Sequence, residues 1–255
     1  MLGKLIMLWR LLTMVRNPAE YIRDRKKRAH KPELQLQLRS GLTILLRSGT
    51  SDRCVFNDLW LERAYDLPGL QYKKYRSIID IGAHIGLYAL FAADASPRAQ
   101  IYAFEPEPEN FALLQKNIDN NHLSDRVHAF AKGIGAKEGT LQLNVMPGRG
   151  ECNSSYRQME ESFSLQVPVT TLENVFHSEN IDHCDLLKVN CEGEEYNIFL
   201  SMPDSLFDSI GAIILNYHLF SPDPAKHPRV LKQRLEERGF MVSKHLRNFF
   251  LATHS

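Results

Sequence analysis

Strands and helices alternate along the chain from residue 77 onward, and this order constrains the fold more than any other feature. Short apolar segments with strand character are separated by segments whose apolar residues recur at helical spacing. Such alternation predicts a mostly parallel sheet with helices on both faces, because each parallel connection must cross over the sheet. The predicted strands are 77–81, 100–104, 127–131, 185–189 and 212–217, and the predicted helices are 86–95, 108–122 and 229–238.

The two ends of the chain modify this plan. Residues 240–245 and 249–253 form consecutive strands without a helix between them, which predicts one antiparallel member of the sheet. Upstream, three elements are predicted: an amphipathic helix within 1–29 that Pro18 breaks or restarts, a hairpin over 34–47 that turns at Ser40-Gly41, and a helix within 51–66.

The expected fold class is therefore α/β. It comprises a doubly wound, mostly parallel, Rossmann-like sheet with a terminal antiparallel strand and an N-terminal extension of helices and a hairpin. We divide the chain into an N-terminal region, residues 1–70, which packs on the core, and a main domain, residues 71–255.

Positive charge is concentrated at the N-terminus. Residues 1–39 contain ten Lys and Arg against three Asp and Glu, a net charge of +7 in a chain whose total is +1. The rest of the chain is mildly acidic, so the main domain is not expected to bind nucleic acid. For residues 1–30, two interpretations stay open: peripheral contact with a membrane, or a helix that packs on the domain and leaves its charges in water.

Location is predicted from what the chain lacks. There is no run of about 18 apolar residues and no small-residue cleavage site after the first apolar stretch. The cysteines Cys54, Cys152, Cys184 and Cys191 have no zinc-site spacing, and the last two, which flank an apolar run, are interpreted as small core residues. A cytoplasmic location, with membrane-peripheral contact as the variant, is expected.

The strongest local motif is the turn from Asp80 to Gly86 (DIGAHIG), which follows an apolar strand and precedes a helix. Glycines there let the backbone approach a ligand, and the helix start offers free N–H groups. Asp80 stands where a dinucleotide fingerprint needs its first glycine, so the motif does not fit a dehydrogenase. It resembles instead the loop of S-adenosylmethionine (SAM)-dependent methyltransferases.

Polar residues also follow the later strands. Glu105 ends the strand after the glycine loop, where a carboxylate can accept both hydroxyls of a ribose. Asn190 and Glu192 follow one later strand, and Asn216 and His218 follow the next. Because the carboxyl ends of parallel strands share one edge, these side chains are predicted to gather on one rim of the sheet.

Four segments in order resemble the FkbM-type methyltransferase family: IIDIGAHIGLYAL, YAFEPEPENFALLQKNI, VPVTTLENV and LLKVNCEGEEYNIF. The resemblance covers roughly residues 40–220. It implies SAM as cofactor and transfer of its methyl group to a hydroxyl of a sugar, polyketide or similar metabolite, which would be a small-molecule or a glycan- or lipid-linked acceptor.

Two positions depart from this family. Asn190 stands where the family usually has Asp, and Asn216 stands where it usually has Glu. An amide cannot act as a carboxylate base or as a strong ligand for a hard cation, so these positions argue against metal-dependent chemistry.

The candidate site follows from the motifs and the resemblance together. His218 is the first choice for the base that takes the acceptor proton, and Glu192 is the second. Acceptor binding is assigned to Asn153, Ser154, Ser155 and Tyr217, and no metal ligand is assigned. Cofactor binding is assigned to Asp80, Gly82, Ala83, His84, Gly86, Glu105, Pro106, Asn110 and Asn190.

Three alternatives remain. Asn190 and Asn216 suit a SAM-binding protein with weak or no catalysis. The basic N-terminus suits a membrane-peripheral module. A NAD-dependent dehydrogenase is disfavoured by the absent first glycine.

Overall fold

A computed structural model describes residues 2–25, 32–145, 163–219, 223–245 and 248–254. In these residues a seven-stranded sheet forms the centre of the molecule, with strand order β11-β12-β10-β9-β3-β4-β5. Its strands are β3 (Ser77–Ile81), β4 (Gln100–Phe104), β5 (Val127–Phe130), β9 (Cys184–Val189), β10 (Ile210–Asn216), β11 (Met241–His245) and β12 (Phe249–Thr253).

The pairing of these strands confirms the predicted α/β class. Strands β10, β9, β3, β4 and β5 pair in parallel, and β12 pairs antiparallel with both β10 and β11. The sheet therefore has the expected single antiparallel member. The connection from β3 runs outward to β4 and β5, whereas β9 lies on the other side of β3, so the order reverses between β3 and β9. Open α/β sheets form their ligand crevice at such a point.

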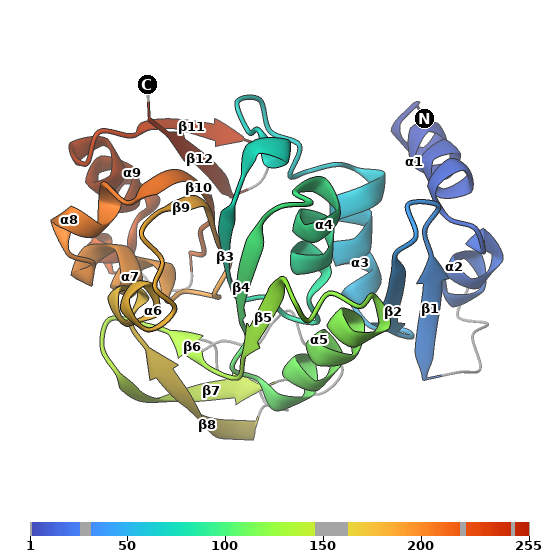
Figure 1. Cartoon of the computed structure of the whole chain (residues 1–255), viewed down its shortest axis with the longest axis horizontal. Helices are drawn as coiled ribbons and strands as arrows, with labels where there is room; N and C mark the ends of the chain where they lie inside the picture. The colour runs from blue at the N-terminus through green and yellow to red at the C-terminus, as the bar shows by residue number, and fades with distance from the viewer. Residues whose placement is uncertain (1, 26–31, 146–162, 220–222, 246–247, 255) are drawn as a thin grey trace.

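Helices cover both faces of the sheet (Figure 1). Alternate strand residues supply two separate cores, because successive side chains point to opposite faces. Ile78 and Leu186 belong to one core and their neighbours Ile79 and Leu187 to the other. The helices are α3 (Asp52–Phe56), α4 (Leu87–Ala95) and α5 (Pro108–Asn120) on the first side, and α6 (Leu172–Ser178), α7 (Glu195–Ser201), α8 (Asp204–Phe207) and α9 (Pro228–Glu237) on the second.

A second sheet was not predicted. Strands β6 (Gly133–Ile134), β8 (Phe163–Thr170) and β7 (Gly139–Val145) pair in that order, below the central sheet in the view of Figure 1. Helices α6, α7 and α8 were missed as well. Each is four to seven residues long, too short for helical periodicity to stand out.

The N-terminal region follows the prediction. Pro18 begins a second helix, as expected, so the region contains α1 (Leu2–Met14) and α2 (Pro18–Arg25). The hairpin is β1 (Glu33–Gln37) with β2 (Thr43–Arg47). The helix predicted within 51–66 begins as α3 and continues as a π-helical segment, η1 (Asn57–Leu61). The segments η2 (Tyr72–Lys74) and η4 (Pro224–Lys226) are 3-10 turns. No described helix is both long and apolar enough to cross a bilayer.

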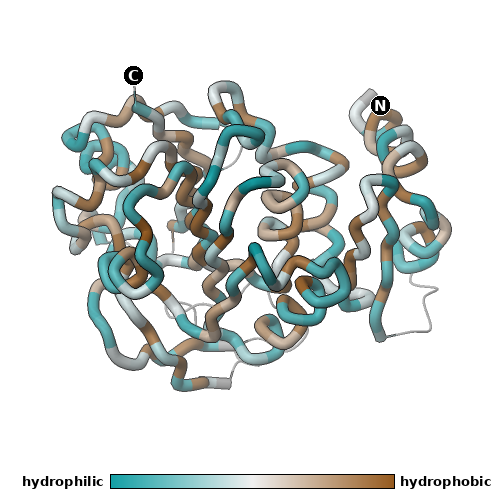
Figure 2. Tube along the Cα trace, in the orientation of Figure 1, coloured by the Kyte–Doolittle hydropathy of each residue, from teal (hydrophilic) through white to brown (hydrophobic). Residues whose placement is uncertain are grey.

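Residues before and after position 70 share one core. Leu36, Ile44 and Phe56 are completely buried in the same cluster as Ile78 and Leu114. Figure 2 shows hydrophobic segments both in the hairpin and in the central strands. This packing joins the two parts. The division at residue 70 stays a prediction.

Helix α5 holds the hairpin through two asparagines one turn apart. The side chain of Asn117 accepts a hydrogen bond from Leu45 N (2.8 Å) and donates to Leu45 O (3.1 Å) and to Ile85 O (2.8 Å). Asn121 pairs in the same way with Thr43 N and O, each at 2.7 Å. The amides thus satisfy the free edge of β2 as a neighbouring strand would.

We expect Asn117→Leu to destabilise the fold by about 2–5 kcal/mol, because it leaves buried N–H and C=O groups of the backbone without partners. Urea unfolding would measure this change. Asn120→Leu is the matched control: it lies on the same helix but is exposed, and should change the free energy of unfolding by about 0.5 kcal/mol or less. Equal effects of the two substitutions would contradict this role of Asn117.

Candidate active site

The glycine loop lies at the point where the strand order reverses. Gly82 follows β3 with φ +74°, and a Cβ at this residue would come within 1.9 Å of the Asn190 carbonyl oxygen. The loop after β3 therefore packs directly against the loop after β9. Gly86, with φ +84°, precedes α4, and its Cβ would come within 2.4 Å of Leu114. Both positions favour glycine, Gly82 because a Cβ would meet the Asn190 backbone and Gly86 because its positive φ is strained for other residues.

A buried ion pair holds this loop. Lys188 Nζ on β9 lies 2.7 Å from Asp80 Oδ1 on β3, and both side chains are almost completely buried. The ammonium also donates to Gly82 O at 2.7 Å. Burial raises the pKa of the Asp80 carboxyl, and the Lys188 charge opposes that effect. Lys188 thereby joins the ends of the two central strands.

Glu105 is buried beside the loop. Its Oε2 accepts a hydrogen bond from His84 N at 2.7 Å, and its Oε1 accepts from Glu107 N at 3.0 Å and lies 3.4 Å from Asn110 Nδ2. Burial raises its pKa to about 7, although these donors favour the ionised form. Glu107 caps α5 by accepting from Glu109 N and Asn110 N. The FEPEPEN segment therefore holds the carboxylate and begins the helix behind it.

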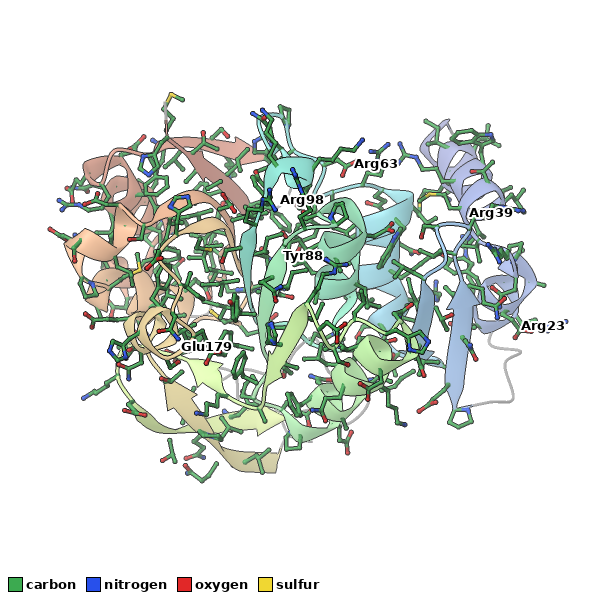
Figure 3. The ribbon with its side chains drawn as sticks, in the orientation of Figure 1. Arg23, Arg39, Arg63, Tyr88, Arg98 and Glu179 are labelled. Carbon is green, nitrogen blue, oxygen red and sulfur yellow. The ribbon has the colours of Figure 1, made fainter. Side chains whose placement is uncertain are left out.

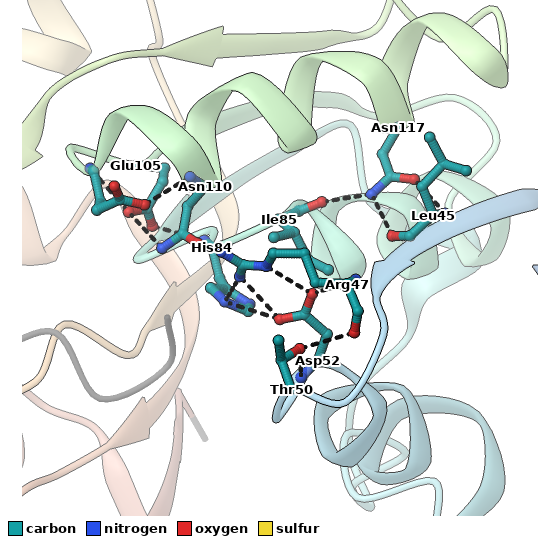
Figure 4. A network of polar contacts seen from close by, with 10 residues as sticks. Leu45, Arg47, Thr50, Asp52, His84, Ile85, Glu105, Asn110 and Asn117 are labelled. Atoms are coloured by element: carbon teal, nitrogen blue, oxygen red, sulfur yellow. Dashed lines mark hydrogen bonds and ion pairs between the residues drawn. The ribbon is translucent and has the colours of Figure 1, made fainter. Parts of the chain in front are cut away.

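The N-terminal region also reaches the glycine loop (Figure 4). Arg47 forms a two-pronged ion pair with Asp52, at 3.0 and 2.9 Å, and its Nη2 lies 2.9 Å from His84 Nε2. Arginine has only donors, so Nε2 must accept and the neutral ring carries its proton on Nδ1. Burial is the main cause that lowers the pKa of His84 to about 4, so the ring is neutral at pH 7. His84 adopts φ +54°, a left-handed conformation uncommon for this residue.

A cavity opens above these residues and encloses about 1000 Å³, part of it continuous with solvent. Gly82, Ala83, His84, Glu105 and Lys188 form one wall. The small sheet closes the cavity with the apolar side chains of Ile134, Leu141, Leu143 and Val167. The N-terminal region contributes a further wall, which consists of Val55, Leu59 and Tyr65.

Three acid and base groups lie at the rim beside Asn190. Glu195 is completely buried and accepts from His218 N (2.6 Å), His218 Nδ1 (3.0 Å) and Gly193 N (2.8 Å). His218 Nε2 lies 3.4 Å from Glu192 Oε1. Although burial opposes the charged form, the two carboxylates raise the pKa of His218 to about 9. Glu192 lines the cavity and has φ +52°, a strained conformation of the kind found at functional sites.

Asn190 and Asn216 contact each other. Asn216 Nδ2 donates to Asn190 Oδ1 at 2.9 Å, which links the ends of β9 and β10. An amide has both a donor and an acceptor, so the two asparagines can form this hydrogen bond directly. Two carboxylates at these positions would repel each other and would need a proton or a cation between them. In the part of the chain that is described, no group of three or more His, Cys, Asp or Glu is arranged to hold a metal ion.

Comparison with known proteins assigns this arrangement. The family model of the methyltransferase FkbM domain matches residues 80–242, which run from Asp80 in the glycine loop to the last helix and β11. The chain belongs to the FkbM methyltransferase family. It is therefore a methyltransferase, as the motifs predicted, and the Rossmann-like fold and the family resemblance are confirmed.

Relatives within this family are distant. Methyltransferase 1 of Beauveria bassiana is 25% identical over 208 residues, which cover 74% of this chain and 81% of the relative. The 31-O-demethyl-FK506 methyltransferase FkbM of Streptomyces tacrolimicus is 24% identical, with 72% and 81% covered. A solved structure of methyltransferase FkbM from Methylobacillus flagellatus is 13% identical with a TM-score of 0.49, and 80% of this chain and 54% of that one are covered.

The predicted cofactor residues fall into two groups in this FkbM-family fold. Those that line the cavity are Gly82, Ala83, His84, Glu105, Pro106 and Asn190. The other three, which we expected to contact the cofactor, lie behind the cavity wall. Asp80 forms an ion pair with Lys188, Gly86 packs on Leu114, and Asn110 contacts Glu105. They support the loop and do not line the cavity, and their contact with the cofactor stays a prediction.

Other predicted positions also change. Tyr217 is buried with its ring 4.6 Å from that of Phe250 and does not line the cavity, and its contact with the acceptor stays a prediction. Cys191, interpreted as a core residue, lines the cavity, whereas Cys184 is buried as expected. Asn153, Ser154 and Ser155 lie outside the described residues, and their role stays a prediction.

Sequence reasoning missed Lys188, Arg47 and Asp52. A lysine inside an apolar strand was the available signal, because a buried charge must have a partner. No comparable signal marks Arg47 and Asp52, since they meet His84 only through folding of the N-terminal region.

We expect His218 to stabilise the fold in a pH-dependent way. Its pKa is raised from the ordinary value of 6.5 to about 9 in the folded chain, so the stabilisation is complete below pH 6.5 and is lost as pH rises through 9. The free energy of unfolding of wild type minus His218→Gln should be largest near pH 6, up to about 3 kcal/mol, and vanish by about pH 10. His177→Gln, at an exposed position, is the control; a difference independent of pH would show that His218 is not held between two carboxylates.

Proposed function

We propose that this protein transfers the methyl group of SAM to a hydroxyl of a small-molecule acceptor, a sugar, a polyketide or a related metabolite. The observation that carries the proposal is Glu105, a buried carboxylate that lines the cavity beside the glycine loop at the end of β4. The FK506-modifying relative, whose name specifies an oxygen position, supports an alcohol as acceptor.

The residues present fit SAM in three parts. Glu105 would accept hydrogen bonds from the two ribose hydroxyls, since each of its oxygens has further acceptor capacity. Phe104, Pro106 and Ile134 offer an apolar wall for the adenine. The glycine loop and His84 would hold the amino-acid portion, because His84 Nδ1–H has no partner among the described residues.

Bound there, SAM supplies a methyl group on a positively charged sulfur, which makes in-line displacement by an oxygen possible. The protein must align the acceptor and remove the hydroxyl proton. We assign proton removal to Glu192, because it lines the cavity and His218 does not. This reverses the order expected from the sequence.

His218 then acts as a positioning residue. With its pKa near 9, the imidazole already carries a proton at neutral pH and cannot take another. Glu195 fixes the ring from behind, and the imidazolium faces Glu192. While Glu192 takes the proton of the acceptor, His218 keeps its contacts with both carboxylates and so holds the geometry of the pair.

Glu105→Gln should weaken SAM binding about 10–100-fold, because charged hydrogen bonds to both ribose hydroxyls are lost. Calorimetric titration with SAM, S-adenosylhomocysteine and 5′-methylthioadenosine would measure it; the last ligand keeps the ribose but lacks the amino-acid portion and should weaken equally. Wild-type affinity should rise with pH through about 7 as Glu105 ionises, and the Gln variant should lose this dependence.

Glu109→Gln, on the exposed start of α5, is the matched control and should bind like wild type. Unchanged affinity in Glu105→Gln would contradict the ribose contact. Absence of binding to the folded wild-type chain would contradict SAM as cofactor.

Glu192→Gln should lower kcat about 10²–10⁴-fold with little change in SAM affinity, because the proton acceptor is lost and the cofactor contacts remain. Transfer of labelled methyl from SAM to a panel of sugars and hydroxylated macrolides would measure it. His218→Gln should lower kcat less and shift its pH profile, and exposed Glu173→Gln should match wild type. Equal kcat in Glu192→Gln and wild type would contradict the assignment.

The Asn190–Asn216 pair favours a second candidate, a SAM-binding family member with weak or no catalysis. Neither amide can accept a proton from an alcohol as a carboxylate does. Tight SAM binding without methyl transfer to any acceptor in the panel would favour this candidate.

A further inference from the structure

Helix α1 carries two apolar stripes. Met7, Leu11 and Met14 recur at helical spacing and pack against the main core, with Leu11 only 3% exposed. This stripe is sufficient to attach the helix to the domain.

The second stripe is largely exposed, and its Trp9 also borders a groove of the domain. Leu5, Leu8, Trp9 and Leu12 recur at positions i, i+3, i+4 and i+7, and they are 61, 46, 63 and 49% exposed. Ile6 adds 40% exposure beside them. A contiguous exposed surface of large apolar side chains, including a tryptophan, marks an interaction site. In Figure 1 the helix lies at the margin of the molecule, beyond the hairpin.

The charges around this stripe are positive. The helix segment 2–16 contains Lys4, Arg10 and Arg16 and no acidic residue. Lys4 and Arg16 are exposed at its two ends, whereas Arg10 donates to Leu61 O. Exposed Arg39 is attached to the helix end, where its N–H donates to Met14 O at 2.8 Å (Figure 3).

The acidic residues Glu20 and Asp24 of α2 already have partners within the chain. Glu20 pairs with Arg23 at 2.6 Å, and Asp24 is buried and accepts from Ser48 and Arg53. The charged residues of α1 itself are therefore all cations, and exposed Asp94 lines the groove that Trp9 borders.

We infer that α1 is a membrane-docking helix that lies in the headgroup region of an anionic bilayer. Apolar residues with a tryptophan on the outward face, bordered by Lys and Arg, match the requirements of an interfacial helix. A second copy of the chain fits less well, because a symmetric contact would bring Lys4 and Arg16 of both copies together. None of the stripe residues lines the active-site cavity, so the inference is independent of the proposed function.

Co-sedimentation of the full chain with phosphatidylcholine vesicles, with and without phosphatidylglycerol, tests this inference. We expect binding to the anionic vesicles that weakens with added salt. The double substitution Leu5→Gln/Trp9→Gln should reduce binding about tenfold or more, because two exposed side chains no longer leave water on docking. Leu200→Gln/Met241→Gln removes exposed apolar residues elsewhere, 44 and 58% exposed, and should bind like wild type.

Fluorescence gives an independent measurement. The chain has two tryptophans, so Trp60→Phe leaves Trp9 as the single emitter. Its emission should shift to shorter wavelength with anionic vesicles and become protected from acrylamide. Wild type that does not bind, or equal binding by both double variants, would overturn the inference. A dimer that Leu5→Gln/Trp9→Gln dissociates, without vesicle binding by wild type, would identify a second copy as the partner instead.

Discussion

The buried contact between Lys188 and Asp80 is the interaction on which the site depends. It joins the ends of β3 and β9, where the strand order reverses, and the same ammonium holds the Gly82 carbonyl. A buried ion pair adds little net stability, because desolvation of both charges offsets their attraction, yet loss of one partner costs about 3–5 kcal/mol. Its value here is positional: it sets the distance between the two loops, which approach so closely that Gly82 has no space for a Cβ.

The N-terminal region completes the site from outside the central sheet. Asn117 attaches β2 to α5 and to Ile85 in the glycine loop, and Arg47 on β2 fixes the His84 ring with the help of Asp52. Leu59 and Tyr65 add part of the cavity wall. The family match begins only at residue 80, so this chain builds part of its active site from residues that precede the matched domain.

The rim beyond Asn190 shows how neutral and charged groups are separated. Asn190 and Asn216 pair without charge, while Glu192, His218 and Glu195 form a chain of two carboxylates with one cation between them. His218 separates the two carboxylates, and Glu192 is the one that lines the cavity. The left-handed conformation of Glu192 directs its side chain there at a local energetic cost.

The sequence by itself determined the sheet, its direction and the ends of its strands. Apolar runs mark the buried strands of the central sheet, and parallel strands necessarily bring their carboxyl ends to one edge, so Gly82, Glu105 and Asn190 could be placed together. Tertiary structure alone decided which side chains face the cavity. Asp80, Gly86 and Asn110 belong to the same motifs but support the wall. The direction in which a side chain points is decided by packing, and spacing along the sequence does not determine it. Likewise, Arg47 reaches His84 and both nitrogens of His218 meet carboxylates only after folding brings distant segments together, and these contacts set the proton positions on which the chemistry depends.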